Sequence, residues 1–228
     1  MGLPARFTIE MAVGRTLPGA QSATRWRRPH PMRIFWLSCV VIGLFLIGSF
    51  AYGMLSGVRE QQHLNQVWQG QIGERPPVPA GVDPALKRPV NGVDFAIRIP
   101  KLDYYAAVKE GIDSGVLYSG PGHYPTTMWP GDPGMTGVAA HNVYWINFPQ
   151  LTKGDEIDVE TRYGLYRYRV TGSQVVNPDN RAVLVPNADG FHLTLTTCWP
   201  LWAGAFATQR FVIFADQFWP IPIRHSYT

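Results

Sequence analysis

The residues best suited to chemistry are a cysteine, an arginine and a histidine in the second half of the chain. Cys198 ends an apolar run and is followed by Trp199-Pro200, so a strand must stop there with its thiol at the rim. Arg210 lies twelve residues further on, where the next apolar run begins. An antiparallel return of the chain would place it beside the thiol. His141 closes another apolar run and therefore also belongs to a strand end.

A thiol, an imidazole and a guanidinium at one place can carry out acyl transfer. The thiolate attacks a carbonyl, the imidazole moves the proton, and the guanidinium holds the oxyanion. An arginine that opens a buried strand is costly to bury unless its donors have a partner, which favours a functional role for Arg210. Taken singly, Cys198 also fits as a small buried apolar side chain and His141 as a structural loop residue.

The remaining histidines of this region suit catalysis less well. His192 precedes Cys198 by six residues in the same run, which at about 3.3 Å per residue separates the two by about 20 Å. His123 lies in a Gly- and Pro-rich turn, where an imidazole often bonds to nearby backbone groups. His141, at a strand end like the thiol, occupies the same type of position as Cys198, and His123 stays the alternative. The second cysteine, Cys39, lies in an apolar segment and is expected to be only a small side chain there.

Short strands must position these residues. About seven runs are β-branched or aromatic and are separated by Gly, Pro, Asn and Asp, at 95–99, 105–108, 137–140, 156–161, 165–176, 191–197 and 210–215. Helical patterns are confined to short segments near 113–117 and 146–151. The pattern favours an all-β barrel or sandwich over an α/β fold, within a domain that spans 92–218 and precedes a tail at 219–228.

An uncharged segment precedes this domain. Residues 34–55 carry no charge and are long enough to cross a membrane as a helix. A cleaved signal peptide is the alternative, but its apolar core usually spans only about 7–15 residues. Residues 1–33 are rich in arginine, which predicts a cytoplasmic N-terminus and an extracytoplasmic remainder. If translation begins at Met32, most of this arginine excess is absent. Residues 56–91 read as a Gln- and Pro-rich linker, with a short helical extension and a polyproline spacer.

The net charge of +4 and the pI near 9.2 first suggest a nucleic-acid partner. The charge is unevenly placed, however. Residues 1–91 hold ten basic against four acidic side chains, a net +6, whereas residues 92–228 hold ten against twelve, a net −2. The basic character thus belongs to the membrane-proximal part, and we expect no nucleic-acid binding.

Together these residues resemble the sortase family of membrane-anchored cysteine transpeptidases of bacterial surfaces. The resemblance rests on the string TLTTC at 194–198, the upstream His141, Arg210 at the head of a strand, and the stretches GPGHYPTTMWPGDPG at 120–134 and FPQL at 148–151 with Gly-Asp at 154–155. It implies a closed eight-stranded β-barrel with the thiol, imidazole and guanidinium at one end of a groove.

The resemblance also implies roles for these residues. Cys198 would attack an LPxTG-like sorting signal at its Thr-Gly bond and form a thioacyl-enzyme, which an amine of the peptidoglycan or envelope then resolves. His141 would be the acid and base, and Arg210 would bind the substrate carbonyl or oxyanion. Surface proteins with a C-terminal sorting signal are the implied partners. We predict further substrate contacts at four neighbours of these residues, Thr196, Thr197, Asn142 and Trp199.

Some features depart from the family pattern. Asn142 follows the histidine where many sortases have arginine, and Asp83-Pro84 is followed by Ala85 rather than by an aromatic residue. With no second apolar helix before Thr228, a single-pass anchoring or housekeeping type is favoured over a pilin-polymerising type. The acidic residues at 155–160 read as a solvated edge, so no metal or cofactor is predicted, with calcium activation left open. A cysteine hydrolase without transfer, or an inactive tethered barrel that binds a sorting motif or wall polymer, are the alternatives.

Overall fold

The computed structural model describes residues 31–72 and 83–220 of the chain. The chain divides into two compact units, Met1–Leu46 and Ile47–Thr228. Helix α1 (Pro31–Ile72) is, by length and composition, the one helix in the described ranges that could cross a membrane. The part of α1 from Ile47 onward belongs to the same unit as the strands.

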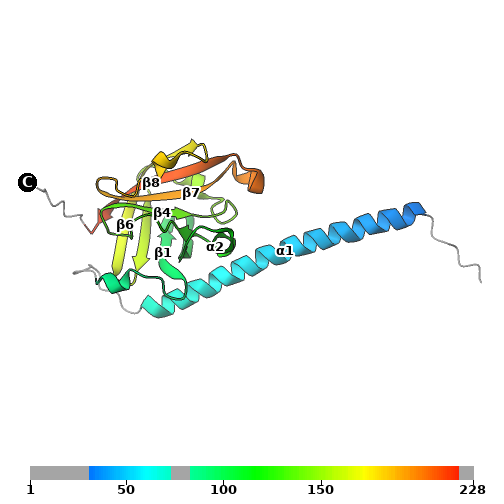
Figure 1. The fold of residues 1–228 in the computed structure, drawn as a ribbon, viewed down its shortest axis with the longest axis horizontal. Coiled ribbons are helices and arrows are strands. Elements are labelled where there is room, and N and C mark those ends of the chain that lie inside the picture. Colours follow the sequence, from blue (N-terminus) through cyan, green and yellow to red (C-terminus); the bar gives the residue numbers. More distant parts are fainter. Residues whose placement is uncertain (1–30, 73–82, 221–228) are drawn as a thin grey trace, which may run out of the picture. The chain divides into compact units, whose positions relative to one another are not determined.

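Eight strands close into a barrel in the order β1-β2-β3-β4-β7-β8-β6-β5 (Figure 1). The pairs β2/β3 and β4/β7 are parallel and the other neighbours are antiparallel. The strands are β1 (Val93–Ile99), β2 (Tyr104–Glu110), β3 (Gly122–His123), β4 (Gly134–Ala139), β5 (Glu156–Thr161), β6 (Gly164–Val176), β7 (Phe191–Trp199) and β8 (Gln209–Trp219). This confirms the closed eight-stranded barrel.

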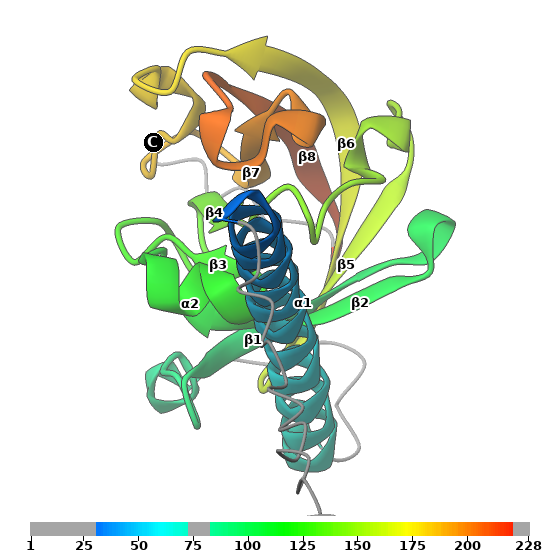
Figure 2. The ribbon, with the colours of Figure 1, turned by 90° about the vertical axis from the view of Figure 1, so that its right-hand side faces the viewer.

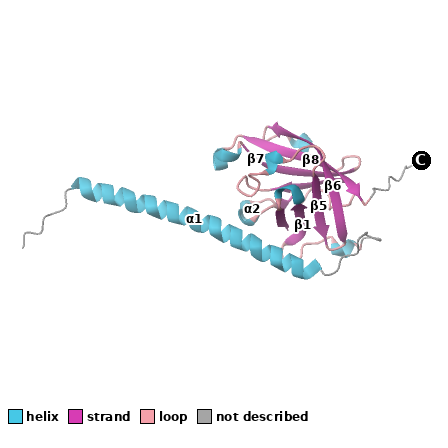
Figure 3. Cartoon of the chain, turned by 180° about the vertical axis from the view of Figure 1, so that it is seen from behind, coloured by secondary structure: helices cyan, strands magenta, loops and turns pink. Residues whose placement is uncertain are grey.

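Short helices occupy the connections between the strands (Figure 3). Asp113 caps α2 (Ser114–Ser119) by accepting hydrogen bonds from two backbone amides of its first turn. The short 3-10 helices are η1 (Pro84–Leu86), η2 (Pro100–Leu102), η3 (Phe148–Gln150), η4 (Arg181–Val183) and η5 (Leu201–Phe206), of which η5 is kinked at Gly204. The helical patterns near 113–117 and 146–151 thus correspond to α2 and η3, and both predictions are confirmed.

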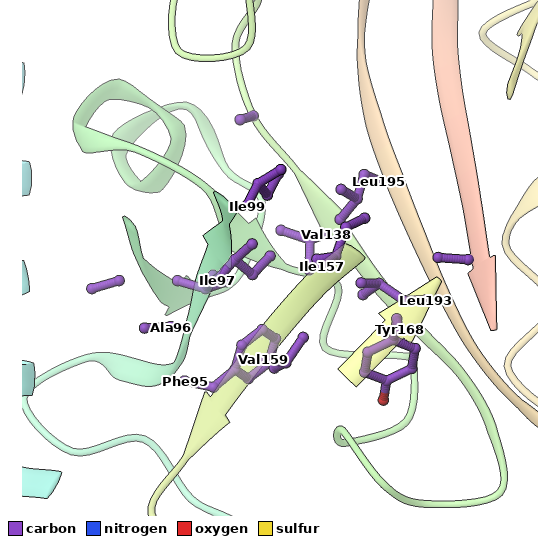
Figure 4. Close-up of a cluster of buried hydrophobic side chains, with 14 of the residues drawn as sticks. Phe95, Ala96, Ile97, Ile99, Val138, Ile157, Val159, Tyr168, Leu193 and Leu195 are labelled. Carbon is purple, nitrogen blue, oxygen red and sulfur yellow. The ribbon is translucent and has the colours of Figure 1, made fainter. Parts of the chain in front are cut away.

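Alternating apolar side chains of the strands fill the barrel. On β6, Tyr166 and Tyr168 are buried while Arg169 is exposed, as their alternation predicts. Figure 4 shows part of the buried cluster, in which side chains from different strands lie together and the ring of Tyr168 lies beside Leu193. Its labelled members are Phe95, Ala96, Ile97, Ile99, Val138, Ile157, Val159, Tyr168, Leu193 and Leu195. Packing of this density fixes the strands, and with them the residues at the strand ends.

The last turns of α1 pack on the barrel rather than forming a spacer. Leu64 and Trp68 are buried in the same apolar cluster as the strands. Asn65 accepts a hydrogen bond from the Ala107 amide (2.7 Å) and donates one to the Tyr105 carbonyl (3.3 Å). These backbone groups lie on the edge of β2 that faces away from β1. Since β3 pairs with β2 only at Lys109 and Glu110, this part of the edge has no neighbouring strand.

The predicted helical extension of the anchor is present, but it packs against the barrel instead of forming a free linker. Residues 56–72 continue α1, and Gln61 adds a hydrogen bond to the Ala107 carbonyl (3.1 Å), so the Gln- and Asn-rich stretch closes the open edge of β2. Residues 73–82, which include Pro76, Pro77 and Pro79 of the predicted polyproline spacer, lie outside the described residues. Pro84 begins η1 instead of an extended segment.

Candidate active site

The thiol and the guanidinium lie on neighbouring strands. Cys198 of β7 and Arg210 of β8 are direct antiparallel partners in the strand register. β4 runs parallel to β7 with Ala139 opposite Thr196, so His141, two residues further along, reaches the level of the thiol. All three predicted residues line one cavity of about 510 Å³. They also line a second cavity of about 250 Å³, so they form the wall that the two cavities share.

The larger cavity is mostly apolar. Apart from the three residues above and Asn142, its lining comes from three segments, which are α1, the connection from β4 to η3, and the η5 region between β7 and β8 (orange in Figure 2). The apolar side chains are Phe50, Met54, Val143, Ile146, Leu201 and Trp202, with Ala205 and Ala207. Sequence reasoning missed these residues. The lack of any charged side chain in 142–151 and 199–209 was the available signal, whereas the contribution of α1 carried none.

The thiol of Cys198 is half-buried and free. The chain's other cysteine, Cys39, belongs to the other compact unit, and no disulfide joins the two. Because Cys198 is the next-to-last residue of β7, its backbone is held by the ladder while its side chain reaches a cavity. A nucleophile needs this combination of a fixed position and access for a substrate.

The imidazole of His141 stands at the solvent edge of the site. Its own backbone carbonyl accepts a hydrogen bond from the Tyr144 amide (3.0 Å), which fixes the turn that carries it. Partial burial lowers the pKa of His141 below the ordinary histidine value. This effect favours the neutral imidazole, which is the form that can accept a proton from a thiol.

Arg210 has hydrogen-bond donors to spare. One terminal nitrogen donates to the Gln209 carbonyl (3.0 Å). No carboxylate in the described ranges lies within ion-pairing distance of its guanidinium. A half-buried cation without an anion is costly, and its donors suit a ligand that brings partial or full negative charge into the cavity.

The four predicted substrate contacts differ in their surroundings. Thr196 and Thr197 are buried at the smaller cavity, where the Thr196 hydroxyl pairs with that of Tyr124 (3.0 Å) and the Thr197 hydroxyl donates to the Ala140 carbonyl (2.9 Å). The Asn142 amide lines the larger cavity and donates to the Leu201 carbonyl. Trp199 packs against the Phe211 ring, 5.5 Å between centroids, and lines neither cavity. The two threonines and Asn142 thus also hold the loops around the site.

The other two histidines lie elsewhere. His123 is buried and pairs with Asp94, 2.8 Å from Nδ1 to the carboxylate, inside the barrel wall. His192 pairs with Asp216 (2.7 Å) near the start of β7, six residues from Cys198, at the opposite end of the barrel. Neither lines a cavity with the thiol. This placement agrees with the sequence-based preference for His141.

Helix α1 approaches the turn of His141 closely. The Tyr118 hydroxyl donates to the Gly53 carbonyl (2.6 Å), and the Tyr144 hydroxyl donates to the Tyr118 carbonyl. Only a glycine fits at position 57, since a Cβ there would lie 2.7 Å from both the Tyr118 carbonyl oxygen and the Tyr144 hydroxyl. The glycines of α1 therefore let the helix contact the segment that follows His141.

A closed eight-stranded barrel with a cysteine, a histidine and an arginine at one rim is the architecture of the β-barrel cysteine transpeptidases. The chain belongs to the sortase family, since the profile of the sortase domain matches residues 97–218.

Known relatives agree with this assignment. Sortase D of Bacillus subtilis is 27% identical over 122 residues, which is 53% of this chain and 62% of that protein, so the match spans less than two thirds of the relative. A sortase D5 transpeptidase of Clostridium perfringens shares the fold, with a TM-score of 0.59 at 22% identity over 70% of this chain and 98% of that one. Sortase E1 of Streptomyces coelicolor, solved with a tripeptide in its active site, has a TM-score of 0.51 at 28% identity over 55% of this chain and 87% of that one.

Proposed function

We propose that this protein is a sortase transpeptidase that cleaves an LPxTG-like sorting signal and transfers the surface protein to an amine of the cell envelope. The observation that carries the proposal is the register of Cys198 opposite Arg210, with His141 on the wall of the same cavities. The tripeptide in the active site of the Streptomyces coelicolor enzyme supports a peptide substrate.

The first half of the reaction forms a thioester. His141 takes the proton of the Cys198 thiol, and the thiolate attacks the carbonyl carbon of the threonine in the signal. The C–N bond to glycine then breaks, and the imidazolium gives the same proton to the departing amine. The lowered pKa of His141 favours this route, because the imidazole begins neutral and ends neutral.

The second half reverses these steps with a new amine. The incoming amine loses a proton to His141 and attacks the thioester, the C–S bond breaks, and the imidazolium returns the proton to the departing sulfur, which restores the thiol. In both tetrahedral intermediates the guanidinium of Arg210 donates to the oxyanion, since its donors are not used by a described carboxylate. In a plain hydrolase, water would take the place of the amine.

The two cavities provide for the rest of the substrate. The larger, apolar cavity suits the aliphatic and proline side chains of an LPxTG-like signal. We propose that Asn142, Thr196 and Thr197 hold the loops that shape both cavities, and that Trp199 supports β8 through Phe211 instead of touching the peptide.

We further propose a single-pass membrane topology. The apolar residues 34–55 lie within α1, which is long enough to span a bilayer. The arginine-rich residues 1–33 would stay in the cytoplasm by the positive-inside rule, and the barrel at 92–218 would lie outside. The substrates proposed above are displayed on that side. An anchoring or housekeeping role remains the subclass that we favour.

The test uses the full chain in detergent micelles, incubated with LPxTG- and LAxTG-like peptides and with hydroxylamine or oligoglycine. We expect an amine-linked product and, by mass spectrometry, an acyl adduct on Cys198, both lost in Cys198→Ala. If the only product is the hydrolysed peptide with a free carboxylate, the protein is a hydrolase. A thiol that is inert to a peptide vinyl sulfone while the peptide still binds would identify a binding protein. Equal turnover by the wild type and Cys198→Ala would overturn the role of the thiol.

A further inference from the structure

We propose that the rim of the larger cavity docks on the lipid surface, so that the active site opens at the membrane interface. The rim consists of Val143, Ile146, Trp202 and Phe206, and is called the apolar rim below. The proposal rests on the membrane anchoring proposed above and adds a second, peripheral contact between the barrel and the bilayer.

The apolar rim is exposed to an unusual degree. The relative exposures of Trp202 and Phe206 are 87% and 89%, and those of Val143 and Ile146 are 48% and 61%. Val143, Ile146 and Trp202 line one cavity, and Phe206 lies between two alanines that line it as well, so the four side chains form a continuous surface. Soluble domains rarely leave such a patch uncovered.

The two loops that carry the apolar rim lack charge. Residues 142–151 and 199–209 contain no Asp, Glu, Lys or Arg, although charged residues are frequent in the rest of the barrel domain. Depletion of full charges allows a surface to enter the interfacial layer of a bilayer without a large desolvation cost. Indole and phenyl rings, such as those of Trp202 and Phe206, are side chains that favour this layer.

Continuity with α1 indicates lipid as the occupant of the apolar rim. Phe50 and Met54 line the same cavity as the rim, and both belong to the uncharged run 34–55 that we place in the membrane. The helix from Ile47 onward belongs to the same compact unit as the barrel, to which Asn65 and Trp68 fix it. If the C-terminal end of the uncharged run 34–55 lies in the bilayer, the apolar rim therefore contacts the bilayer surface.

Two tyrosines lie on α1 or against it at the level of Phe50 and Met54. Tyr118, with 49% exposure, donates its hydroxyl to the Gly53 carbonyl, and Tyr52 on α1 is exposed as well. The first charged residues after the run are Arg59 and Glu60. Along α1, apolar residues are followed by tyrosines and then by charged residues. This order is found where a helix leaves a bilayer. The catalytic cysteine would thus meet sorting signals presented at the membrane surface.

The test measures the depth of single nitroxide labels on the full chain in phosphatidylethanolamine–phosphatidylglycerol vesicles. Cys39→Ala and Cys198→Ala remove the native thiols, and Phe206→Cys and Ile146→Cys carry the labels on the rim. Val185→Cys is the matched control. Val185 is also apolar and 47% exposed, but the adjacent Pro186 bonds to Met135 at the start of β4, at the opposite end of the barrel. A fourth label, Phe45→Cys, reports whether the helix is inserted.

The measured quantity is the ratio of the collision rate with oxygen to that with a water-soluble nickel chelate. We expect this ratio to be several-fold higher for the rim labels than for the Val185 label. If the rim labels are as exposed to water as the Val185 label while the Phe45 label is exposed to lipid, the docking is wrong and the anchoring still holds. An aqueous Phe45 label would overturn both. Rim labels that become shielded only when a sorting peptide with an apolar tail is added, or only at high protein density, would also overturn the proposal, in favour of substrate or of a second copy.

Discussion

Cys198 and Arg210 face each other across the β7–β8 ladder, each at the end of its strand. A ladder fixes which residues are opposite, and a slip of one residue would turn the side chain of Arg210 to the other face of the sheet. The relative position of the Cys198 thiol and the Arg210 guanidinium is therefore held by backbone hydrogen bonds of both strands, whereas His141 is held by a loop beyond β4.

The first prediction concerns Arg210. Arg210→Gln should lower kcat for peptide transfer by about 100- to 1,000-fold, the cost of losing one oxyanion donor. Arg210→Lys should recover little of this loss, because an ammonium lacks the planar fork of donors. Steady-state kinetics of peptide transfer would measure both variants.

The matched control for Arg210 is Arg169→Gln. Arg169 lies exposed on β6 with its guanidinium 4.1 Å from the centroid of the Phe218 ring, away from both cavities. Its replacement should leave kcat nearly unchanged. Wild-type kcat in Arg210→Gln would remove the oxyanion role from this residue.

The second prediction concerns the titration of two histidines in one spectrum. In a Cys198→Ala variant, which removes coupling to the thiol, His141 should titrate below the ordinary histidine value of about 6.5, because burial disfavours its charged form. His192 should titrate above it. Burial also opposes the charge of His192, but bonds to the Asp189 carbonyl and the Asp216 carboxylate outweigh that effect and raise its pKa.

Nitrogen-15 correlation spectra of histidine-labelled protein at a series of pH values would follow both rings. Asp216→Asn should lower the midpoint of His192 and leave that of His141 unchanged, because the two rings lie at opposite ends of the barrel. A midpoint for His141 above that of His192 would contradict the desolvation argument.

The third prediction concerns the contact between α1 and the catalytic turn. Gly57→Ala places a methyl group 2.7 Å from the Tyr118 carbonyl and the Tyr144 hydroxyl, so the helix or the turn must move. Because Tyr144 bonds to the backbone of His141, we expect kcat/KM to fall by more than the fold stability alone would explain. Transfer kinetics and thermal unfolding of the same preparation would separate the two effects.

The control for the helix is Gly70→Ala. Gly70 lies on the same helix with nothing near its missing Cβ, so alanine there should stabilise the helix by up to about 1 kcal/mol and leave the kinetics alone. Tyr144→Phe combined with Gly57→Ala should restore part of the rate, since it removes one of the two close contacts. If Gly57→Ala and Gly70→Ala have the same kinetics, the helix does not position the turn.

Much of the barrel could be predicted from the sequence, because its longer strands carry their own periodic pattern. The run at 156–161 coincides with β5, and the spacing from Cys198 to Arg210 predicted their partnership. β3 was not found from the pattern, because a strand of two residues, Gly122–His123, is too short for alternation to show. Only the resemblance to the family supplied the eighth strand.

The part of the site that escaped prediction is the part made by tertiary contact. Phe50 and Met54 reach the cavity because α1 is held on the barrel, and no local pattern of the apolar run distinguishes them from their neighbours. Likewise the polar residues 61 and 65 resemble a solvated linker until the open edge of β2 is known. Such side-chain amides are buried where they have hydrogen-bond partners, and their polarity alone does not predict this.

The last prediction concerns this open edge. Asn65→Leu keeps the size of the side chain but removes its hydrogen bonds with the Ala107 amide and the Tyr105 carbonyl. A buried amide that loses its partner costs about 1–3 kcal/mol, so the loss at Ala107 should lower the free energy of unfolding by about that amount. Gln66→Leu, on the exposed face of the same turn, is the control for the substitution itself and should have little effect. Denaturant unfolding in micelles measures the stability, and hydrogen exchange at the Ala107 amide localises the loss. That amide should exchange faster in Asn65→Leu and at the wild-type rate in Gln66→Leu. If its protection were unchanged, the Asn65 side chain would not be what closes the edge of β2, and the Gln61 hydrogen bond with the buried Leu64 and Trp68 would hold the helix on the barrel.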